Sequence, residues 1–470
     1  MARYRDNLLL LTDSYKVTHW ALYPPGTQRV YSYFESRGGR FPETVAFGLQ
    51  VLLAEVLEGA VVTHARIDHA RDRLARHFGR PLLHEAGWRR VVDECGGRLP
   101  VSIRAVPEGA VVPVRNVLLT IENTRDFAFW LPSYLETLLV QQWYPMTVTT
   151  LSREVKKLIA AFLDETGDLA ELPFKLHDFG FRGASSIESA ALGGAAHLVN
   201  FEGSDTLAAV ELVAEHYDCE MAGFSVPATE HSVMSMWTEA GERDAFARAL
   251  AVHPEGVLSV VSDTWDVFRV CEAIVGADPL RSRVLRRSGP LVIRPDSGEP
   301  VAVILRCLEL LAKAFGTVTN AKGFRELPPQ LRLLWGDAVE LESLREILAA
   351  LRDAGWSTGL LVFGMGGGLL QKVDRDTQQF AFKAAWGLVA GDPPEGRAVY
   401  KEPATGPDKV SKRGRMKLAW REGPAGPRLA TVPESSPEPD QLVEVFRDGR
   451  ILRRWRFAEV RERARLLHGP

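Results

Sequence analysis

The sequence contains few cysteines and no long apolar run, and it carries almost no net charge. Its four cysteines include no CxxC pair, so neither a zinc site nor a disulfide framework is indicated, and we expect a reducing compartment. The apolar run near the amino terminus is four leucines, which is too short for a signal-peptide core, and nothing later approaches a membrane span. We therefore expect a cytoplasmic protein without a membrane partner.

A net charge of −3 gives no overall field that would attract nucleic acid or anionic lipid. The basic segment Lys409–Lys417 resembles a nucleic-acid patch in composition, but it lacks interleaved aromatic residues. A solvated loop and a loop that faces a phosphate are the two interpretations left open for it. The expected partners are small molecules or other subunits, and no nucleic acid.

The 470 residues, 46% hydrophobic and 25% charged, are typical of a globular protein with a large core. We predict a mixed α+β domain in two parts, residues 1–170 and 385–470, around an α/β barrel of residues 171–384. Two strand-like runs in the tail flank Asp448-Gly449, a plausible hairpin turn. The tail is therefore expected to rejoin the N-terminal region.

From about residue 174 the sequence repeats a short apolar run, a polar cluster and a helical stretch, mostly at spacings near one βα unit. Such a series predicts a barrel or a doubly wound sheet, and in both folds ligands bind at the carboxyl ends of the strands. Helix capping and turn formation are the alternative for any single cluster, but the set together favours a shared site. The clusters are HDFGFRG at 177, GSDT at 203, SVPATEH at 225, VVSDTWD at 260, IRPDSG at 293, WGDAV at 335 and FGMGGG at 363.

Several residues in these clusters suit a phosphorylated sugar substrate. The glycine run in Phe363–Lys372 would let backbone N–H groups approach an anion, although it matches neither a P-loop nor GxGxxG. Arg182 and Arg294 suit phosphate oxygens, with structural ion pairs as the alternative. Carboxylates for ribose hydroxyls or Mg²⁺ come from Asp263, Asp266, Asp296 and Asp337.

One histidine and two aromatic residues complete the candidates. His231 opens a predicted helix and could serve as acid, base or phosphate acceptor, although a lone histidine is more often structural. Phe179 and Tyr15 are candidates for stacking on a flat heterocycle, although most aromatic residues belong to the core.

Taken in order, these motifs resemble those of the type II phosphoribosyltransferases, in the arrangement of the nicotinamide phosphoribosyltransferase family. The similarity extends from about residue 7 to 460, through TDSYKVTHWALYPP, VYSYFESR, KLHDFGFRGASS, GSDT, SVPATEHS, VVSDTWD, IRPDSG, WGD and FGMGGGLLQKVDRDT. The resemblance implies an α/β barrel with a second mixed domain, and a homodimer with its active sites at the interface. It also implies the reaction of nicotinamide with phosphoribosyl pyrophosphate to give nicotinamide mononucleotide and pyrophosphate, with Mg²⁺.

By this resemblance, Phe179 and the Tyr15 of a partner subunit would sandwich the pyridine ring. Asp205 would accept a hydrogen bond from the carboxamide, and Arg182 and Arg294 would hold the ring amide and the phosphate side. Asp296, close to the ribose, would be a catalytic residue. Further substrate-binding residues, at the 5′-phosphate, at the phosphates across the interface and elsewhere in the site, would be Ser262, Gly336, Asp337, Gly366, Gly367, Arg375 and Lys383.

The resemblance also implies that ATP phosphorylates His231 and that Asp266 orients this histidine. ATP is then a co-substrate, and the residues that contact Mg²⁺ are left unassigned. Three positions depart from the family pattern: Phe181 replaces a tyrosine, and Met365 and Ala381 replace serines. We expect these departures to change substrate affinities rather than the reaction.

Two other functions are compatible with the fold. A nicotinate phosphoribosyltransferase would share the phosphate chemistry, but the carboxylate of Asp205 would attract an amide and repel nicotinate, a difference of roughly 2–5 kcal/mol when desolvated. A catalytically silent binding or signalling protein is disfavoured because the chain retains His231, Asp205 and the residues around them. We therefore predict that nicotinamide is the substrate.

Overall fold

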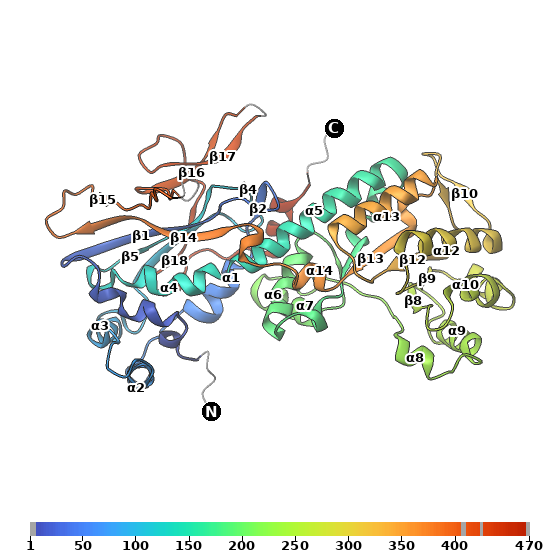
Figure 1. The fold of residues 1–470 in the computed structure, drawn as a ribbon, viewed down its shortest axis with the longest axis horizontal. Coiled ribbons are helices and arrows are strands. Elements are labelled where there is room, and N and C mark those ends of the chain that lie inside the picture. Colours follow the sequence, from blue (N-terminus) through green and yellow to red (C-terminus); the bar gives the residue numbers. More distant parts are fainter. Residues whose placement is uncertain (1–5, 406–409, 424–425, 467–470) are drawn as a thin grey trace. The chain divides into compact units, whose positions relative to one another are not determined.

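The computed structural model describes residues 6–405, 410–423 and 426–466 (Figure 1). The chain divides into two compact units. Unit 1 comprises the residues up to Thr150 together with 216–218 and 374–465, and unit 2 comprises 151–215 and 219–373. Within the described part, no helix is both long and apolar enough to cross a lipid bilayer.

These divisions differ from the predicted boundaries at residues 170 and 384, for two structural reasons. Helix α5 (Trp143–Thr166) continues through the first division, so no break in the sequence marks it. The second division precedes β14 (Phe380–Val389), which the sequence assigned partly to the barrel. This strand instead pairs antiparallel with β1 (Thr27–Ser36) of unit 1 along its whole length.

Unit 1 is built on a seven-stranded sheet in the order β15-β14-β1-β5-β3-β18-β19. Figure 1 shows β14, from the later part of the chain, beside β1, near its beginning. At the other side, β18 pairs with β3, and β18 and β19 form the hairpin predicted around Asp448. The remaining strands are β3 (Val101–Ala105), β5 (Val117–Asn123), β15 (Arg397–Ala398), β18 (Val443–Arg447) and β19 (Arg450–Ile451), with the small pairs β2 (Glu43–Val45) with β4 (Val111–Pro113) and β16 (Met416–Arg421) with β17 (Arg428–Pro433).

Apolar residues of one face of this sheet pack against helices. Helix α4 (Leu131–Val140) buries most of its leucines and Tyr134, and it packs on β1, β5 and β14. Trp88 and Trp130 meet edge to face, with ring centroids 4.6 Å apart, and both are buried. The other helical elements of unit 1 are η2 (Leu8–Leu10), η3 (Ser14–Ala21), α1 (Leu49–Leu52), η4 (Leu53–Leu57), α2 (His64–Phe78), α3 (Glu85–Cys95), η5 (Asp126–Ala128), η10 (Arg375–Thr377) and α15 (Phe457–Ala464).

Unit 2 is built on six parallel strands in the order β7-β6-β13-β12-β9-β8. The strands are short and almost wholly buried, as expected for a parallel sheet covered by helices. They are β6 (Leu176–Asp178), β7 (Gly203–Ser204), β8 (Leu258–Val261), β9 (Leu291–Arg294), β12 (Leu331–Trp335) and β13 (Leu361–Met365), and β10 (Val318–Thr319) forms a separate pair with β11 (Arg325–Glu326).

The segment 224–229 connects the two outer strands of this sheet. Phe224 forms a parallel bridge with Gly203 in β7, and Ala228 forms one with Ser259 in β8. The six strands and the segment 224–229 therefore form a closed series of seven segments in chain order. This number agrees with the seven strand ends predicted from the sequence. This arrangement is a curled parallel sheet of the barrel type.

Helices follow the strands of unit 2, as in repeated βα units. The amphipathic α12 (Pro300–Phe315) buries Ile304, Leu308 and Leu311 on one face, at the spacing that a helix requires. The helical elements of unit 2 are η6 (Leu169–Phe174), η7 (Phe181–Gly183), α6 (Ile187–Leu198), α7 (Leu207–His216), α8 (His231–Ser235), α9 (Glu242–Val252), α10 (Val267–Arg269), η8 (Val270–Ile274), α11 (Leu280–Leu285), α12 (Pro300–Phe315), α13 (Leu341–Asp353), η9 (Thr358–Leu360) and α14 (Gly367–Leu370).

Candidate active site

The residues that follow the parallel strands of unit 2 form a polar edge, which we call the rim. Phe179, directly after β6, donates its backbone N–H to the carbonyl of Met365 at 3.0 Å. Its ring lies against Gly364 of β13, where a Cβ atom would come within 2.0 Å of the ring carbons. A glycine is therefore required at position 364 for the aromatic ring to occupy this place.

Arg294 and Asp296 lie beside this ring. The guanidinium carbon of Arg294 is 5.4 Å from the Phe179 ring centroid, within the range of a cation–π contact. Its Nη2 donates to both carboxylate oxygens of Asp296 at 3.1 Å. Its Nε is buried without a hydrogen-bond partner in the described structure. Gly336 borders the same group, because a Cβ there would lie 3.4 Å from Asp296 Oδ1.

His231, at the start of α8, faces two carboxylates of the rim. Its Nε2 lies 3.8 Å from Asp263 Oδ1 and 3.9 Å from Asp296 Oδ2, and its side chain is half exposed. Its Nδ1 lies 3.2 Å from the hydroxyl of Thr264. Both ring nitrogens therefore have polar neighbours, while the imidazole remains open to a ligand.

Asp263, rather than the predicted Asp266, is the aspartate of VVSDTWD that lies within ion-pair distance of His231. Asp266 instead caps α10, since its Oδ1 accepts the N–H groups of Phe268 at 2.9 Å and Arg269 at 3.2 Å. The Asp263 side chain is buried, and its Oδ2 accepts from Asp296 N at 3.0 Å and from Ser297 Oγ at 2.5 Å. The Asp266 carboxylate is thus engaged as the cap of α10, and the Asp263 carboxylate is the one that lies at the rim.

Asp205, directly after β7, stands at the rim next to the end of β6. Its backbone N–H donates to the Asp178 carbonyl at 3.0 Å, and its Oδ1 accepts the Ser225 hydroxyl at 2.5 Å. Asp178 is itself fully buried, with Oδ1 accepting from Gly180 N at 2.7 Å. Burial raises the pKa of Asp178 to about 6, with nearby Asp205 adding to the shift and the hydrogen bond from Gly180 opposing it.

Other predicted rim residues are less closely grouped. Arg182 and Asp337 are exposed, in η7 and after β12 respectively. Ser262 is buried and donates its hydroxyl to the Val260 carbonyl at 2.7 Å, so this hydroxyl is used within the strand. A Cβ at Gly367 would meet no atom within 4 Å, and one at Gly366 would lie 3.4 Å from the Phe179 carbonyl. The backbone at Gly367 therefore borders open space.

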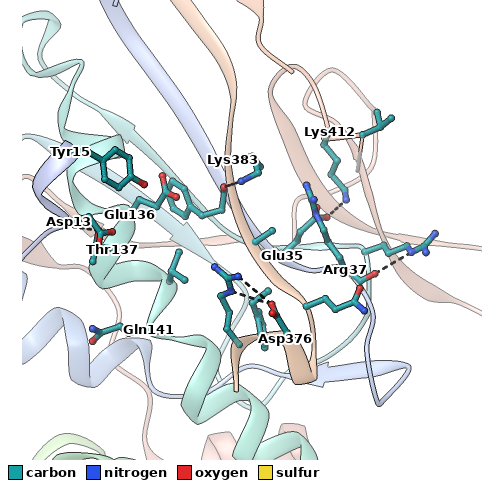
Figure 2. Close-up of a pocket in the computed structure, with 18 residues that line it drawn as sticks. Asp13, Tyr15, Glu35, Arg37, Glu136, Thr137, Gln141, Asp376, Lys383 and Lys412 are labelled. Atoms are coloured by element: carbon teal, nitrogen blue, oxygen red, sulfur yellow. Dashed lines mark hydrogen bonds and ion pairs between the residues drawn. The ribbon is translucent and has the colours of Figure 1, made fainter. Parts of the chain in front are cut away.

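Three predicted residues, Tyr15, Arg375 and Lys383, lie in unit 1, where they line a cavity of about 1220 Å³ (Figure 2). This volume exceeds that of most small-ligand pockets. Figure 2 shows Tyr15 and Glu136 on one side of this unit 1 cavity and Arg37 and Lys412 on the other. Its charged lining residues are Asp13, Glu35, Arg37, Arg115, Glu136, Arg375, Asp376, Lys383 and Lys412.

Most of the charges in the unit 1 cavity are paired with one another. Arg37 and Lys412 both form ion pairs with the buried Glu35. Lys383 differs, because its ammonium donates to a backbone carbonyl, that of Phe382, at 2.9 Å. Burial lowers the pKa of Lys383, although Glu136 opposes the shift. A bound anion would stabilise the charged form of this lysine.

The residues that sequence reasoning missed come mainly from this cavity. Glu35 and Arg37 belong to VYSYFESR, but no role was predicted for either, and only the packing of this segment against β14 brings them to the cavity. The segment predicted as solvated or phosphate-facing contributes Lys412 to the lining, whereas Lys409 lies outside the described residues. At the rim, Ser225 was overlooked, although its place in SVPATEH beside a strand end was a usable signal.

The three departures from the family pattern occupy different places. Phe181 is exposed in η7. Met365 is buried in β13, so its side chain belongs to the core. Ala381 lines the unit 1 cavity, where it offers no hydroxyl.

Metal ligands of the usual kind do not gather in the described residues, where no group of three or more His, Cys, Asp or Glu side chains could hold an ion. The rim does, however, contain a carboxylate oxygen suited to a cation. Asp263 Oδ1 is buried and has no hydrogen-bond partner within the described part of the chain. Mg²⁺ commonly binds through one or two carboxylates and several waters.

Comparisons with known proteins agree with this geometry. Residues 174–449 match the nicotinate phosphoribosyltransferase (NAPRTase) family, and residues 7–103 match the nicotinamide phosphoribosyltransferase N-terminal domain. The chain is 49% identical over 469 residues to a nicotinamide phosphoribosyltransferase of Xanthomonas campestris pv. campestris (strain 8004), covering 98% of each. It is 32% identical to one of Acinetobacter baylyi, covering 98% of this chain and 97% of that protein. The crystal structure of a nicotinate-nucleotide pyrophosphorylase from Pyrococcus furiosus shares the fold, with a TM-score of 0.62 at 14% identity over 99% of this chain and 96% of that one.

Proposed function

The chain belongs to the nicotinate phosphoribosyltransferase family, and we propose that it transfers the phosphoribosyl group of phosphoribosyl pyrophosphate to nicotinamide in NAD salvage. Its full-length relatives of 49% and 32% identity carry the name nicotinamide phosphoribosyltransferase. The observation that carries the choice of base is the carboxylate of Asp205 at the strand end next to Phe179. All four cysteines are free, which supports a cytoplasmic location.

The base binds at the rim in this proposal. The pyridine ring stacks on Phe179, and the carboxamide N–H₂ donates to Asp205. Arg294 lies next to the same ring and holds Asp296, and with Arg182 it meets the anionic part of the substrate. A carboxylate at the substituent would be repelled by Asp205, so nicotinate is disfavoured.

The pyrophosphate binds among cations of a second copy of the chain, whose unit 1 cavity supplies Tyr15, Arg375 and Lys383. Exposed apolar side chains on the helices that follow the rim strands support a homodimer of this kind. Ile187 is 67% exposed, Leu207 75% and Met236 83%, at the starts of α6 and α7 and the end of α8. Large exposed apolar side chains of this kind suit a protein–protein contact.

The reaction forms a bond from the pyridine nitrogen to C1′ of the ribose and breaks the bond from C1′ to the pyrophosphate oxygen. Positive charge develops on the ribosyl centre, and the carboxylate of Asp296 stabilises it in this proposal. The leaving pyrophosphate gains negative charge, which the arginines and Lys383 neutralise. Gly366 and Gly367 let the backbone approach the 5′-phosphate. Bound Mg²⁺, held by Asp263 and Asp296, would add to the neutralisation of the pyrophosphate.

ATP use is assigned to His231. An unprotonated ring nitrogen attacks the γ-phosphorus of ATP, and ADP leaves. The half-exposed imidazole between Thr264 and Asp263 supports this role, with Asp263 in the orienting position. Incubation with γ-labelled ATP is expected to give an acid-labile label that is absent from His231→Ala, and equal labelling of that variant would reject the assignment.

The function is tested by incubating the protein with phosphoribosyl pyrophosphate and nicotinamide. We expect release of pyrophosphate together with a product of the mass of nicotinamide mononucleotide. Asp205→Asn is expected to reduce this rate with nicotinamide by at least about tenfold. No product from nicotinamide, with turnover of nicotinate instead, would assign the chain to the other branch of the family.

A further inference from the structure

The side chain of Ser225 lies on the same rim as Asp205 because the backbone pairing places it there. Ser225 directly follows Phe224, whose N–H donates to the Glu202 carbonyl at 2.7 Å and whose carbonyl accepts from Ser204 N at 3.0 Å. Asp205 directly follows Ser204. Ser225 and Asp205 are therefore each the first residue after a pair of hydrogen-bonded segments, and they lie side by side at the rim.

The contact between them is a short, charge-assisted hydrogen bond. Ser225 Oγ donates to Asp205 Oδ1 at 2.5 Å, a length typical of O–H···O⁻ bonds. The backbone of Asp205 is held separately, by its N–H on the Asp178 carbonyl at 3.0 Å. Both the main chain and one carboxylate oxygen of Asp205 are thus fixed, and Oδ2 is the oxygen left for a ligand.

Such a bond changes what the rim can recognise. An exposed aspartate without it would sample several rotamers, and a ligand would have to order the side chain on binding. The bond also occupies the serine hydroxyl. A free hydroxyl at this position could donate to a carboxylate substituent, whereas a hydroxyl committed to Asp205 leaves the rim with an acceptor only.

We propose that Ser225 is a specificity-determining positioning residue, which orients Asp205 toward a carboxamide and withholds a donor from a carboxylate. This inference rests on the proposed function, because it needs Asp205 to contact the base. The alternative is that the bond only joins two strand ends and has no effect on the choice of base. The two interpretations differ in whether loss of the Ser225 hydroxyl changes the KM for nicotinamide and the preference for nicotinamide over nicotinate.

The test compares Ser225→Ala with Ser225→Thr, which keeps the hydroxyl, in the full-length protein. For Ser225→Ala we expect the KM for nicotinamide to rise about tenfold, as for the loss of one hydrogen bond to a charged group. The kcat and the KM for phosphoribosyl pyrophosphate are expected to stay within about twofold. The preference for nicotinamide over nicotinate should fall about tenfold, and Ser225→Thr should recover most of it.

A matched control is available at Ser297. Its hydroxyl also donates to a rim aspartate, Asp263 Oδ2, at 2.5 Å, but on another strand end. Ser297→Ala is expected to leave the preference between the two bases unchanged. The double variant adds a second check: in an Asp205→Asn background, Ser225→Ala should alter the nicotinamide KM by less than about twofold, because the two side chains act as one unit.

Three results would overturn the inference while leaving the proposed function intact. The first is an unchanged base preference in Ser225→Ala when the wild type prefers nicotinamide. The second is an equal loss in Ser225→Ala and Ser225→Thr, and the third is full additivity with Asp205→Asn. A wild type without nicotinamide turnover would instead remove the proposed function itself and this inference with it. Far-UV circular dichroism of each variant shows whether a loss comes from unfolding.

Discussion

The rim of unit 2 and the cavity of unit 1 differ in how their charged side chains are held in place. At the rim, most polar side chains follow a buried strand, and the groups bond to neighbours at adjacent strand ends, as Asp205 does with Ser225 and Asp263 with Ser297. In the cavity, Glu35 forms ion pairs with Arg37, two residues away, and with Lys412, which comes from a distant part of the chain. In the proposed function, the rim holds the pyridine ring and the cavity of a second copy holds the pyrophosphate.

The largest expected effect is on activity, and it tests whether the rim and the cavity of one active site come from different subunits. Arg294→Ala at the rim and Lys383→Glu in the cavity should each leave about 1% of the activity or less, because each removes a positive charge that faces the pyrophosphate in the proposed arrangement. If rim and cavity of one active site come from different subunits, mixed dimers contain one intact site. Co-expression should then restore about a quarter of the wild-type rate.

This co-expression result is measured as pyrophosphate release by the purified mixture. Absence of any recovery, with dimers confirmed by sedimentation, would place both regions of one active site in the same chain and would contradict the proposed arrangement.

The second prediction tests the aromatic contact at the rim. Gly364→Val should lower kcat/KM for nicotinamide by about 100-fold or more, because a Cβ would lie 2.0 Å from the Phe179 ring and displace it. Gly367→Ala, at the start of the following helix α14, should leave the nicotinamide KM within about threefold, since its Cβ meets no atom within 4 Å. Equal effects of the two substitutions on this KM would show that Phe179 does not contact the base.

The third prediction concerns stability at the rim. Folding raises the pKa of Asp178 from 3.8 to about 6, so the folded chain binds this proton more tightly than the unfolded chain. The contribution of Asp178 to stability is therefore greatest below about pH 4 and declines as the pH rises through 6, by about 3 kcal/mol at most. Asp178→Asn keeps an acceptor for Gly180 but cannot ionise.

Relative to the wild type, Asp178→Asn should gain stability between pH 4 and pH 7, as measured by urea unfolding at both pH values. A constant difference between the two proteins across this range would mean that Asp178 has an ordinary pKa in the folded chain.

The smallest expected effect concerns the contact to His231. Thr264→Val removes the hydroxyl that lies 3.2 Å from Nδ1, a contact that is exposed to solvent. We expect the stimulation by ATP to fall about threefold, with little change in the rate without ATP. Asp266→Asn, which alters the cap of α10, should reduce this stimulation no more than Thr264→Val does. A much greater loss of ATP stimulation in Asp266→Asn would restore Asp266 as the orienting residue.

The sequence predicted the rim far better than the cavity, and the reason is physical. Parallel strands with helical crossovers must end at one edge, so the order of the motifs was enough to place Phe179, Asp205 and Arg294 together. The sequence could not distinguish Asp263 from Asp266, because both follow β8 and only the local turn decides which one caps α10. The boundary near Thr150 was missed because a continuous helix carries no break.

The cavity depends instead on long-range antiparallel pairing. Its lining combines η3, β1, α4, β14 and the loop before β16, and no local pattern links these segments. Arg375 and Lys383 were named from the family resemblance, and Tyr15 also as an aromatic candidate for stacking. The place of Glu35, Arg37 and Glu136 in the cavity became visible only from the pairing of β1 with β14 and the packing of α4 on both strands.

The central claim, that Asp205 makes this enzyme select nicotinamide, is tested most directly by competition. The wild type is given equal concentrations of nicotinamide and nicotinate with limiting phosphoribosyl pyrophosphate, and the two mononucleotides are quantified by mass spectrometry. Their ratio equals the ratio of kcat/KM values, and we predict an excess of nicotinamide mononucleotide of about 30-fold or more. A ratio near one, or an excess of nicotinate mononucleotide, would contradict the account.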